Sequence, residues 1–190
     1  MSLSKALSAL QSGQVIAHAT ETCYGFACDI FNEEALERLY QLKQMPCSKP
    51  VSILVGDLKM AKKFGIFSKK ALDLAKKHWP GPLTIVLERK KSLPKFLNPG
   101  HKTVGIRVPK HALSLELVRK FGSPLTTTSA NISTKPSPYS VSAIKAQFKK
   151  EQLKPDFMID SGRLPRNPPS TIVDLSGKKM RIIRQGEIIL

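Results

Sequence analysis

The sequence predicts an α/β fold in which a mixed parallel and antiparallel sheet is flanked by helices. Two observations lead to this prediction. Short apolar or β-branched runs, typical of strands, alternate irregularly with segments whose apolar residues recur at helical spacing. Some expected strands are joined by a helix and others by a loop, which favours a mixed sheet over a purely parallel, doubly wound one. The 190 residues, 41% of them apolar, are enough for one core, and we expect a single domain over residues 1–190.

Helices and strands alternate through the first part of the chain. Leu7 and Leu10 lie three residues apart before Gly13, a residue that commonly ends a helix. Asn32 is a favourable N-cap for a helix that runs to Lys43 and that Pro46 ends. The expected helices span residues 4–12, 32–43, 57–64 and 68–77, and the expected strands span 15–19, 24–30, 51–55, 83–87 and 104–108.

The rest of the chain ends in short strands. A helix is expected at 111–121 and a strand at 125–129, whose threonines favour extended structure. A polar loop with two prolines then leads to a helix at 141–149. The last expected strands span 157–160, 171–175 and 181–184, and the proline-rich stretch at 164–169 is too short to separate two domains.

The chain is strongly basic. Its 31 Lys and Arg residues outnumber 14 Asp and Glu residues, which gives a formal net charge of +17 and a pI near 10.0. Such an excess favours a polyanionic partner. A solvated cationic surface with no partner is the alternative, because many of the lysines are spread over separate helices.

The composition argues against disulfides, a protein-held metal and a membrane anchor. Cys23, Cys28 and Cys47 show no Cys-x-x-Cys spacing, and the four histidines are isolated from one another. No basic segment followed by an apolar one begins the chain, and no apolar run approaches the ~18 residues of a membrane span. We therefore expect a cytoplasmic protein.

One lysine falls on an apolar helix face. Lys43 follows Leu36 by seven residues and Leu39 by four, so on a helix it extends their stripe. A lysine that snorkels past the core edge, or that favours a helix C-terminus, explains this placement as well as a functional role does.

Polar side chains also gather where expected strands end. Thr20, Glu21 and Thr22 follow one strand, and a run of hydroxyls at residues 126–129 leads to Asn131 at the exit of another. Hydroxyls and an amide at a strand end suit a carboxylate or phosphate ligand, although an ordinary polar turn has the same composition. Neither a Gly-x-x-x-x-Gly-Lys-Ser/Thr loop nor a Gly-x-Gly-x-x-Gly loop is present, so side chains would have to hold any phosphates.

Two arginines alternate with apolar residues inside expected strands. They are Arg107 and Arg184. A strand arginine usually faces solvent, but strand cations that point into a shared cleft are good anion clamps.

Taken together, several segments resemble a known family. They are Thr20 to Gly25, Lys43 to Pro46 with Lys49-Pro50, Trp79 to Thr84, Thr103 to Pro109, Thr128 to Asn131, Ser170 to Asp174 and Ile183 to Gly186. In this order they are similar to the signature segments of the YrdC/TsaC family, the threonylcarbamoyl-AMP synthases of the short single-domain type. The resemblance extends from about residue 13 to residue 187.

The resemblance implies a fold and a reaction. The fold is a YrdC-like α/β domain with a twisted sheet and a basic concave cleft. The activity is that of a nucleotidyltransferase that forms threonylcarbamoyl-AMP and pyrophosphate from L-threonine, bicarbonate or CO₂ and ATP, with Mg²⁺ carried by the nucleotide. Partner proteins then transfer the threonylcarbamoyl group to the adenosine next to the anticodon of tRNAs that read ANN codons.

The resemblance also implies roles for individual residues. The expected threonine-binding residues are Thr22, Arg107, Ser129 and Ser170. The expected ATP-binding residues are Lys43, Lys49, Thr103, Asn131 and Arg184. Lys43 is the expected catalytic residue, because it would supply positive charge where the pyrophosphate leaves.

The sequence departs from the family pattern at several positions. Met45 stands where the family has the arginine of Lys-x-Arg, so one phosphate-clamping cation is missing unless Lys49 takes its place. Ala19 replaces a proline, Thr134 a glycine, and Tyr139 stands where a Thr or Ser commonly touches ATP.

Two other functions stay open at this point. A paralogue with weak or no synthase activity that binds double-stranded RNA or tRNA would account for the net charge and for Met45. A carbamoyl-AMP-forming relative, like the YrdC-like module of hydrogenase maturation proteins, is less consistent with the sequence, which has no zinc-finger or acylphosphatase segment.

Overall fold

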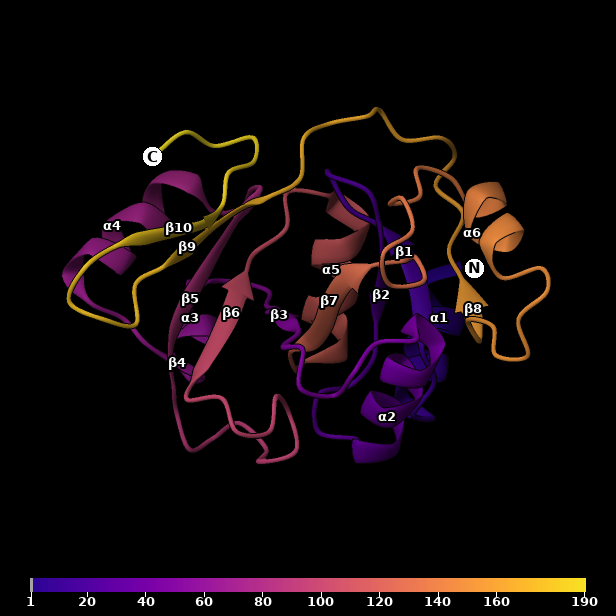
Figure 1. The fold of residues 1–190 in the computed structure, drawn as a ribbon, viewed down its shortest axis with the longest axis horizontal. Helices are drawn as coiled ribbons and strands as arrows, with labels where there is room; N and C mark the ends of the chain where they lie inside the picture. Colours follow the sequence, from indigo (N-terminus) through magenta and orange to yellow (C-terminus); the bar gives the residue numbers. More distant parts are fainter. Residues whose placement is uncertain (1) are drawn as a thin grey trace.

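The computed structural model describes residues 2–190, which build one ten-stranded mixed sheet with helices packed on it (Figure 1). The strand order is β10-β9-β5-β6-β3-β7-β2-β1-β8, and β4 pairs with β5 off this path. The pairs β1·β8, β3·β6 and β5·β9 are parallel and the other pairs are antiparallel. The predicted mixed sheet with flanking helices is therefore confirmed.

The elements lie close to their predicted places. The strands are β1 (Ile16–Ala19), β2 (Tyr24–Ala27), β3 (Ser52–Leu54), β4 (Gly65–Ile66), β5 (Leu83–Arg89), β6 (Thr103–Arg107), β7 (Leu125–Ser129), β8 (Phe157–Met158), β9 (Thr171–Asp174) and β10 (Arg181–Arg184). The helices are α1 (Ser2–Gln11), α2 (Glu33–Lys43), α3 (Leu58–Ala61), α4 (Lys69–His78), α5 (Ala112–Phe121) and α6 (Val141–Gln147).

Two hydrophobic clusters lie on opposite faces of the sheet. In β1, Ile16 belongs to the cluster that includes residues of α1 and α5, and Ala17 belongs to the cluster that includes residues of α2, α4 and α6. Since successive side chains of a strand point to opposite faces, these helices cover both sides of the sheet. Figure 1 shows α4 beside β9 and β10 at one end, and α1, α2 and α6 near the other end.

The predicted helix at 57–64 is much shorter in the structure. The side chain of Asp57 accepts a hydrogen bond from the amide of Met60 and so caps α3, as expected of this residue type. The chain then turns, and Gly65 and Ile66 pair with β5 as the short strand β4. A two-residue strand has no periodicity of its own, so the pattern at 57–64 did not reveal it.

Helix α2 is capped at both of its ends. Asn32 accepts a hydrogen bond from the amide of Ala35 at 2.9 Å and caps the helix at its start, as predicted. Gln44 adopts a left-handed conformation with φ of 48° and ends the helix after Lys43.

No helix within residues 2–190 combines the length and the apolar character needed to cross a bilayer.

Candidate functional site

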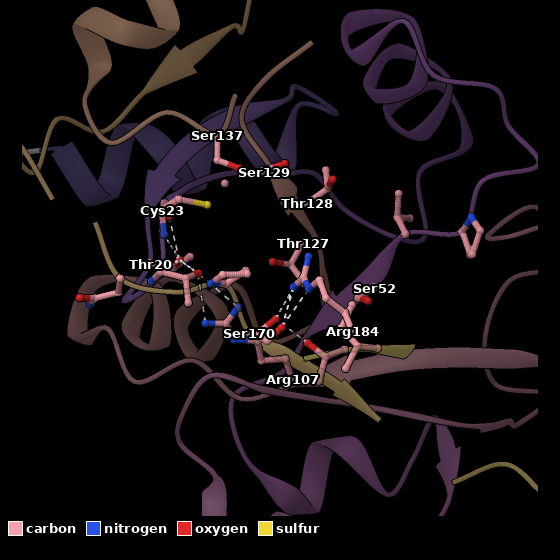
Figure 2. Close-up of a pocket in the computed structure, with 18 of the residues that line it drawn as sticks. Thr20, Cys23, Ser52, Arg107, Thr127, Thr128, Ser129, Ser137, Ser170 and Arg184 are labelled. Atoms are coloured by element: carbon pink, nitrogen blue, oxygen red, sulfur yellow. Dashed lines mark hydrogen bonds between the residues drawn. The ribbon is translucent and has the colours of Figure 1, made fainter. Parts of the chain in front are cut away.

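A cavity of about 380 Å³ is lined by residues of seven strands, from β2 to β10, and of the loops next to them (Figure 2). The strand residues that line it are Gly25, Ser52, Thr84, Arg107, Thr127, Thr128, Ser129, Ile172 and Arg184. The loop residues are Thr20, Thr22, Cys23, Lys49, Pro50, Val51, Ser137, Tyr139, Asn167, Pro169 and Ser170. Within residues 2–190, this lining holds three cations and many hydroxyls but no carboxylate.

Strand β6 supplies part of the floor. Val104 and Ile106 point into the core, so Gly105 and Arg107 point to the other face, where the cavity lies. A Cβ atom built on Gly105 would collide with the side chain of Ser52 on β3. Gly105, two residues before Arg107, thus leaves room for the hydroxyl of Ser52 on the neighbouring strand.

The turn between β1 and β2 is organised by the hydroxyl of Thr20. This hydroxyl donates to the carbonyl of Cys23 at 2.7 Å and accepts from the amides of Thr22 and Cys23 at 3.2 and 3.3 Å. It also lies 3.0 Å from the hydroxyl of Thr22. The hydrogen-bonding side chains that the sequence places after β1 thus form a closed turn, and Thr22 of this turn lines the cavity.

Arg107 is buried and paired with Glu21. Its Nη2 atom lies 2.8 Å from Oε1 of Glu21, and the two side chains are 7% and 15% exposed. Its contacts with the hydroxyl of Thr22 are longer, at 3.4 and 3.5 Å. The Nε atom of Arg107 is buried without a hydrogen-bond partner in the described structure, so the guanidinium keeps donor capacity for a ligand.

Arg184 approaches the same place from strand β10. Its Nε and Nη2 atoms donate to the carbonyl of Ser170 at 3.0 and 2.8 Å, and Nη2 also donates to the hydroxyl of Ser170 at 2.9 Å. Burial and the nearby positive charge of Arg107 lower the pKa of Arg184. Figure 2 shows both arginines on one side of the cavity, with Ser129 and Ser137 on the other. Two guanidinium groups that line the same cavity favour an anionic ligand there.

Lys43 does not line the cavity, but its side chain bonds to the backbone of a residue that does. The residue is 3% exposed, and its ammonium donates to the carbonyls of Ser129 at 2.6 Å and Asn131 at 2.9 Å. It also stands 5.8 Å from the ring centre of Phe26. The pKa of Lys43 is lowered from 10.5 to about 8, mainly by burial and to a smaller extent by the positive charge of Lys49. Two of the three ammonium donors are thus used by the backbone at the end of β7, and one is left.

The structure brings most of the predicted site residues together. Thr22, Lys49, Arg107, Ser129, Ser170 and Arg184 line the cavity, whereas Lys43, Thr103 and Asn131 do not. Thr103 pairs with Glu88 at the start of β6, four residues before Arg107, which is about 13 Å along a strand. Asn131 is 6% exposed and its amide donates to the carbonyls of Ile132 and Lys135, while its Oδ1 atom has no partner in the described structure.

Met45 belongs to the hydrophobic core. It is 8% exposed, packs in the larger cluster and does not line the cavity. Lys49, four residues later, does line the cavity. The cation that the family pattern places at position 45 is therefore replaced here by an apolar side chain that contributes to packing.

Sequence reasoning missed several lining residues. Asn167 reaches the cavity from the proline-rich stretch, where nothing in the spacing marks it, and its amide donates to the carbonyl of Glu21 at 2.9 Å. Ser52 did carry a signal, because it is a polar residue between the buried apolar residues Val51 and Ile53. The partnership of Glu21 with Arg107 joins residues far apart in the chain, so only the folded sheet reveals it.

Comparisons with known proteins place this geometry in a family. A putative threonylcarbamoyl-AMP synthase from Methanocaldococcus jannaschii is 36% identical over 177 residues, covering 93% of this chain and 82% of the relative. A threonylcarbamoyl-AMP synthase from Pseudoalteromonas translucida is 35% identical over 94% of this chain and 96% of its own length. The crystal structure of Pyrococcus abyssi Sua5 complexed with L-threonine superposes with a TM-score of 0.90 at 31% identity.

The extent of these matches differs. The P. abyssi alignment covers 97% of this chain but only 54% of the Sua5 chain, so this protein spans about half of that relative. The family model, which is described as telomere recombination, matches residues 8–186. This chain therefore belongs to the Sua5/YciO/YrdC family.

Proposed function

We propose that this protein is an L-threonylcarbamoyladenylate synthase, which forms threonylcarbamoyl-AMP and pyrophosphate from L-threonine, bicarbonate or CO₂ and ATP. The observation that carries the proposal is the cavity itself, where Lys49, Arg107 and Arg184 meet a rim of Thr and Ser hydroxyls with no carboxylate in the described lining. Relatives that match nearly the whole chain are named for this activity, and a structural neighbour is described as complexed with L-threonine.

The threonine end of the site is proposed at Arg107. Its guanidinium faces the hydroxyl of Thr22 and stands near Arg184, whose hydrogen bonds fix Ser170. A carboxylate suits such an arginine, because a guanidinium donates along two parallel directions. Thr22, Ser170 and Ser129 are then the hydroxyl-bearing residues left to contact the amine and side chain of threonine.

The ATP end is proposed at Lys49, Arg184 and the exit of β7. Lys49 reaches the cavity from the loop after α2, and the ammonium of Lys43 donates to the carbonyl of the lining residue Ser129. Asn131, whose Oδ1 atom is unpaired, and Thr103 remain proposed nucleotide contacts that would require ATP to extend beyond the cavity lining. Mg²⁺ would enter bound to the ATP phosphates.

The reaction needs no protein nucleophile. The amine of threonine adds to CO₂ and loses a proton, which gives a carbamate. A carbamate oxygen then attacks the α-phosphorus of ATP, the bond from that phosphorus to the bridging oxygen breaks, and pyrophosphate leaves. The site's task is to align the substrates and to place positive charge where negative charge develops, for which Arg184, Lys49 and Lys43 are suited. The cavity would also shield the carbamate from water.

The direct test is pyrophosphate release by the purified protein. We expect release from ATP only when threonine and bicarbonate are both present, with valine as a control that keeps the shape of threonine but lacks its hydroxyl. The acylated nucleotide should appear in equal amount by mass spectrometry. Pyrophosphate release that is independent of threonine, or none at all, would contradict the proposal.

Cys23 provides a second readout that does not depend on turnover. Its side chain lines the cavity, Cys28 is fully buried and Cys47 is exposed. In a Cys47→Ser background, maleimide should label Cys23 slowly, since burial raises the pKa of its thiol. Threonine with ATP should slow the labelling further. Unchanged labelling at saturating substrates would mean that they bind elsewhere.

A further inference from the structure

We infer that Glu21 is a positioning residue for threonine recognition, one that acts by holding the guanidinium of Arg107. The inference rests on the proposed function, because it takes the carboxylate of threonine as the ligand of Arg107. Glu21 itself would not touch the substrate.

The ion pair is the strongest contact that Arg107 makes. Nη2 of Arg107 lies 2.8 Å from Oε1 of Glu21, whereas its distances to the Thr22 hydroxyl are 3.4 and 3.5 Å. Hydrogen bonds with a charged donor and acceptor are short and about twice as strong as neutral ones. Without Glu21, only the two long contacts to a hydroxyl would hold a long and flexible side chain.

Glu21 is in turn held by a second element. The same Oε1 atom accepts a hydrogen bond from the backbone amide of Lys110 at 3.1 Å, just beyond the end of β6. Burial raises the pKa of Glu21, but the charge and hydrogen bonds of Arg107, with the Lys110 amide, outweigh burial and lower it overall. The carboxylate is therefore ionised at neutral pH and fixed between the β1–β2 turn and the loop that precedes α5.

The carboxylate of Glu21 contacts Arg107 from outside the lining of the substrate cavity. Glu21 is not among the residues that line that cavity, but it lines a neighbouring cavity of about 400 Å³ together with Lys77 and Lys110. Arg107 lines only the first of these cavities. The guanidinium thus reaches the substrate cavity, whereas the carboxylate that holds it does not.

If only charge mattered, Glu21 would weaken threonine binding instead of supporting it. A negative group beside Arg107 weakens the attraction of the arginine for a second carboxylate, and its removal would then tighten threonine binding. Burial decides between the two effects. Arg107 is 7% exposed, and a buried arginine that loses its partner either reorients or destabilises the fold. A second cation, Arg184, lines the same cavity and adds positive charge for a ligand carboxylate.

The decisive variant is Glu21→Gln in the full chain, measured by calorimetric binding of L-threonine and of ATP. Glutamine keeps an oxygen for Arg107 and Lys110 but loses the charge that makes the pair strong. We expect the Kd of threonine to rise about tenfold and that of ATP to change by less than about twofold. Equal losses for both ligands, or tighter threonine binding, would overturn the inference.

A matched control separates positioning from general stability. Asp156→Asn removes the carboxylate of another ion pair, with Arg38 at 2.5 Å, and neither residue lines the cavity. This variant should lower the melting temperature without changing the Kd of threonine. If Glu21→Gln does not fold, Glu21→Asp keeps the charge and shortens the side chain, and we expect the same selective loss of threonine affinity.

A double-mutant cycle tests the route through Arg107. In an Arg107→Lys background, Glu21→Gln should cost no further threonine affinity, because residues that act as one unit are not additive. Additive effects would show that Glu21 acts by another route. If the unaltered protein binds no threonine, the proposed function fails as well, whereas normal threonine binding with an unaffected Glu21→Gln variant removes only the positioning role.

Discussion

The ammonium of Lys43 donates a 2.6 Å hydrogen bond to the carbonyl of Ser129, the last residue of β7. A second bond at 2.9 Å to the carbonyl of Asn131 completes a link between the end of α2 and the chain that leaves β7. Ser129 lines the cavity, so the positive charge is one hydrogen bond away from the lining. Lys43 therefore has a structural role that its position on an apolar stripe did not reveal.

Lys43→Ala should lower stability as well as activity. The change removes buried methylenes and leaves two carbonyls without their donor, which we expect to cost about 2–4 kcal/mol of unfolding free energy. Lys43→Met leaves the same two carbonyls without a donor, but it should cost less than Lys43→Ala because methionine fills the space of the lost methylenes. Both variants should lose pyrophosphate release. Denaturant unfolding and the release assay check this, and a Lys43→Met enzyme that keeps most of its activity would remove Lys43 from the mechanism.

The depressed pKa of Lys43 gives a second prediction. The pKa of a solvated lysine is 10.5, and that of Lys43 in the fold is about 8, so between these pH values the unfolded chain binds more protons than the folded one. The unfolding free energy of the unaltered protein, relative to Lys43→Met, should thus rise from pH 8 to pH 10.5 and stay constant below pH 8. Activity should fall above pH 8 as the charge is lost. A flat difference across this range would contradict the lowered pKa.

The sequence predicted those features that follow from local patterns. Alternation in β6 placed Arg107 on the face opposite the core, and the stripe of α2 placed Lys43 inward. The sheet order and the ion pair of Arg107 with Glu21 depend on contacts between distant segments, for which the residues carry no local signal. Asn167 was missed for the same reason, since it enters the cavity from a stretch with no regular structure.

The net charge of +17 predicts RNA binding that weakens steeply with salt. Exposed lysines gather on α3, α4 and the loop after β5, where the Lys90 ammonium contacts the Lys62 carbonyl at 2.7 Å. We expect tRNA and duplex RNA to bind with little sequence preference. Replacing both Lys69 and Lys70 by Glu should reduce the slope of log K against log salt by about 0.9 for each phosphate that the variant no longer neutralises.

The matched control changes charge elsewhere. Lys149 and Lys150, also exposed, follow α6, and replacing both by Glu alters the net charge by the same amount. This control should leave the salt slope nearly unchanged if the surface of α3 and α4 binds the RNA. Equal effects of the two double variants would indicate a diffuse attraction with no single surface, and binding that is insensitive to salt would rule out the electrostatic account.

The last prediction concerns Met45→Arg, which exchanges packing for charge. Met45 is 8% exposed within the larger core cluster, so a guanidinium there must be buried or must displace its neighbours. We expect the unfolding free energy without nucleotide to fall by about 1–3 kcal/mol. The same arginine restores the family's Lys-x-Arg pattern. A guanidinium can donate hydrogen bonds to two phosphate oxygens, whereas a thioether can donate none. Met45 does not line the cavity, so this contact requires the guanidinium to displace its neighbours and reach the phosphates. ATP affinity should then rise about tenfold or more, a gain of roughly 1–3 kcal/mol for one charged contact. Met45→Gln is the matched control, since it adds polarity without charge and should show the loss of stability but no gain in ATP binding. Unchanged ATP affinity in Met45→Arg would mean that Lys49, which already lines the cavity, performs the role of the missing arginine.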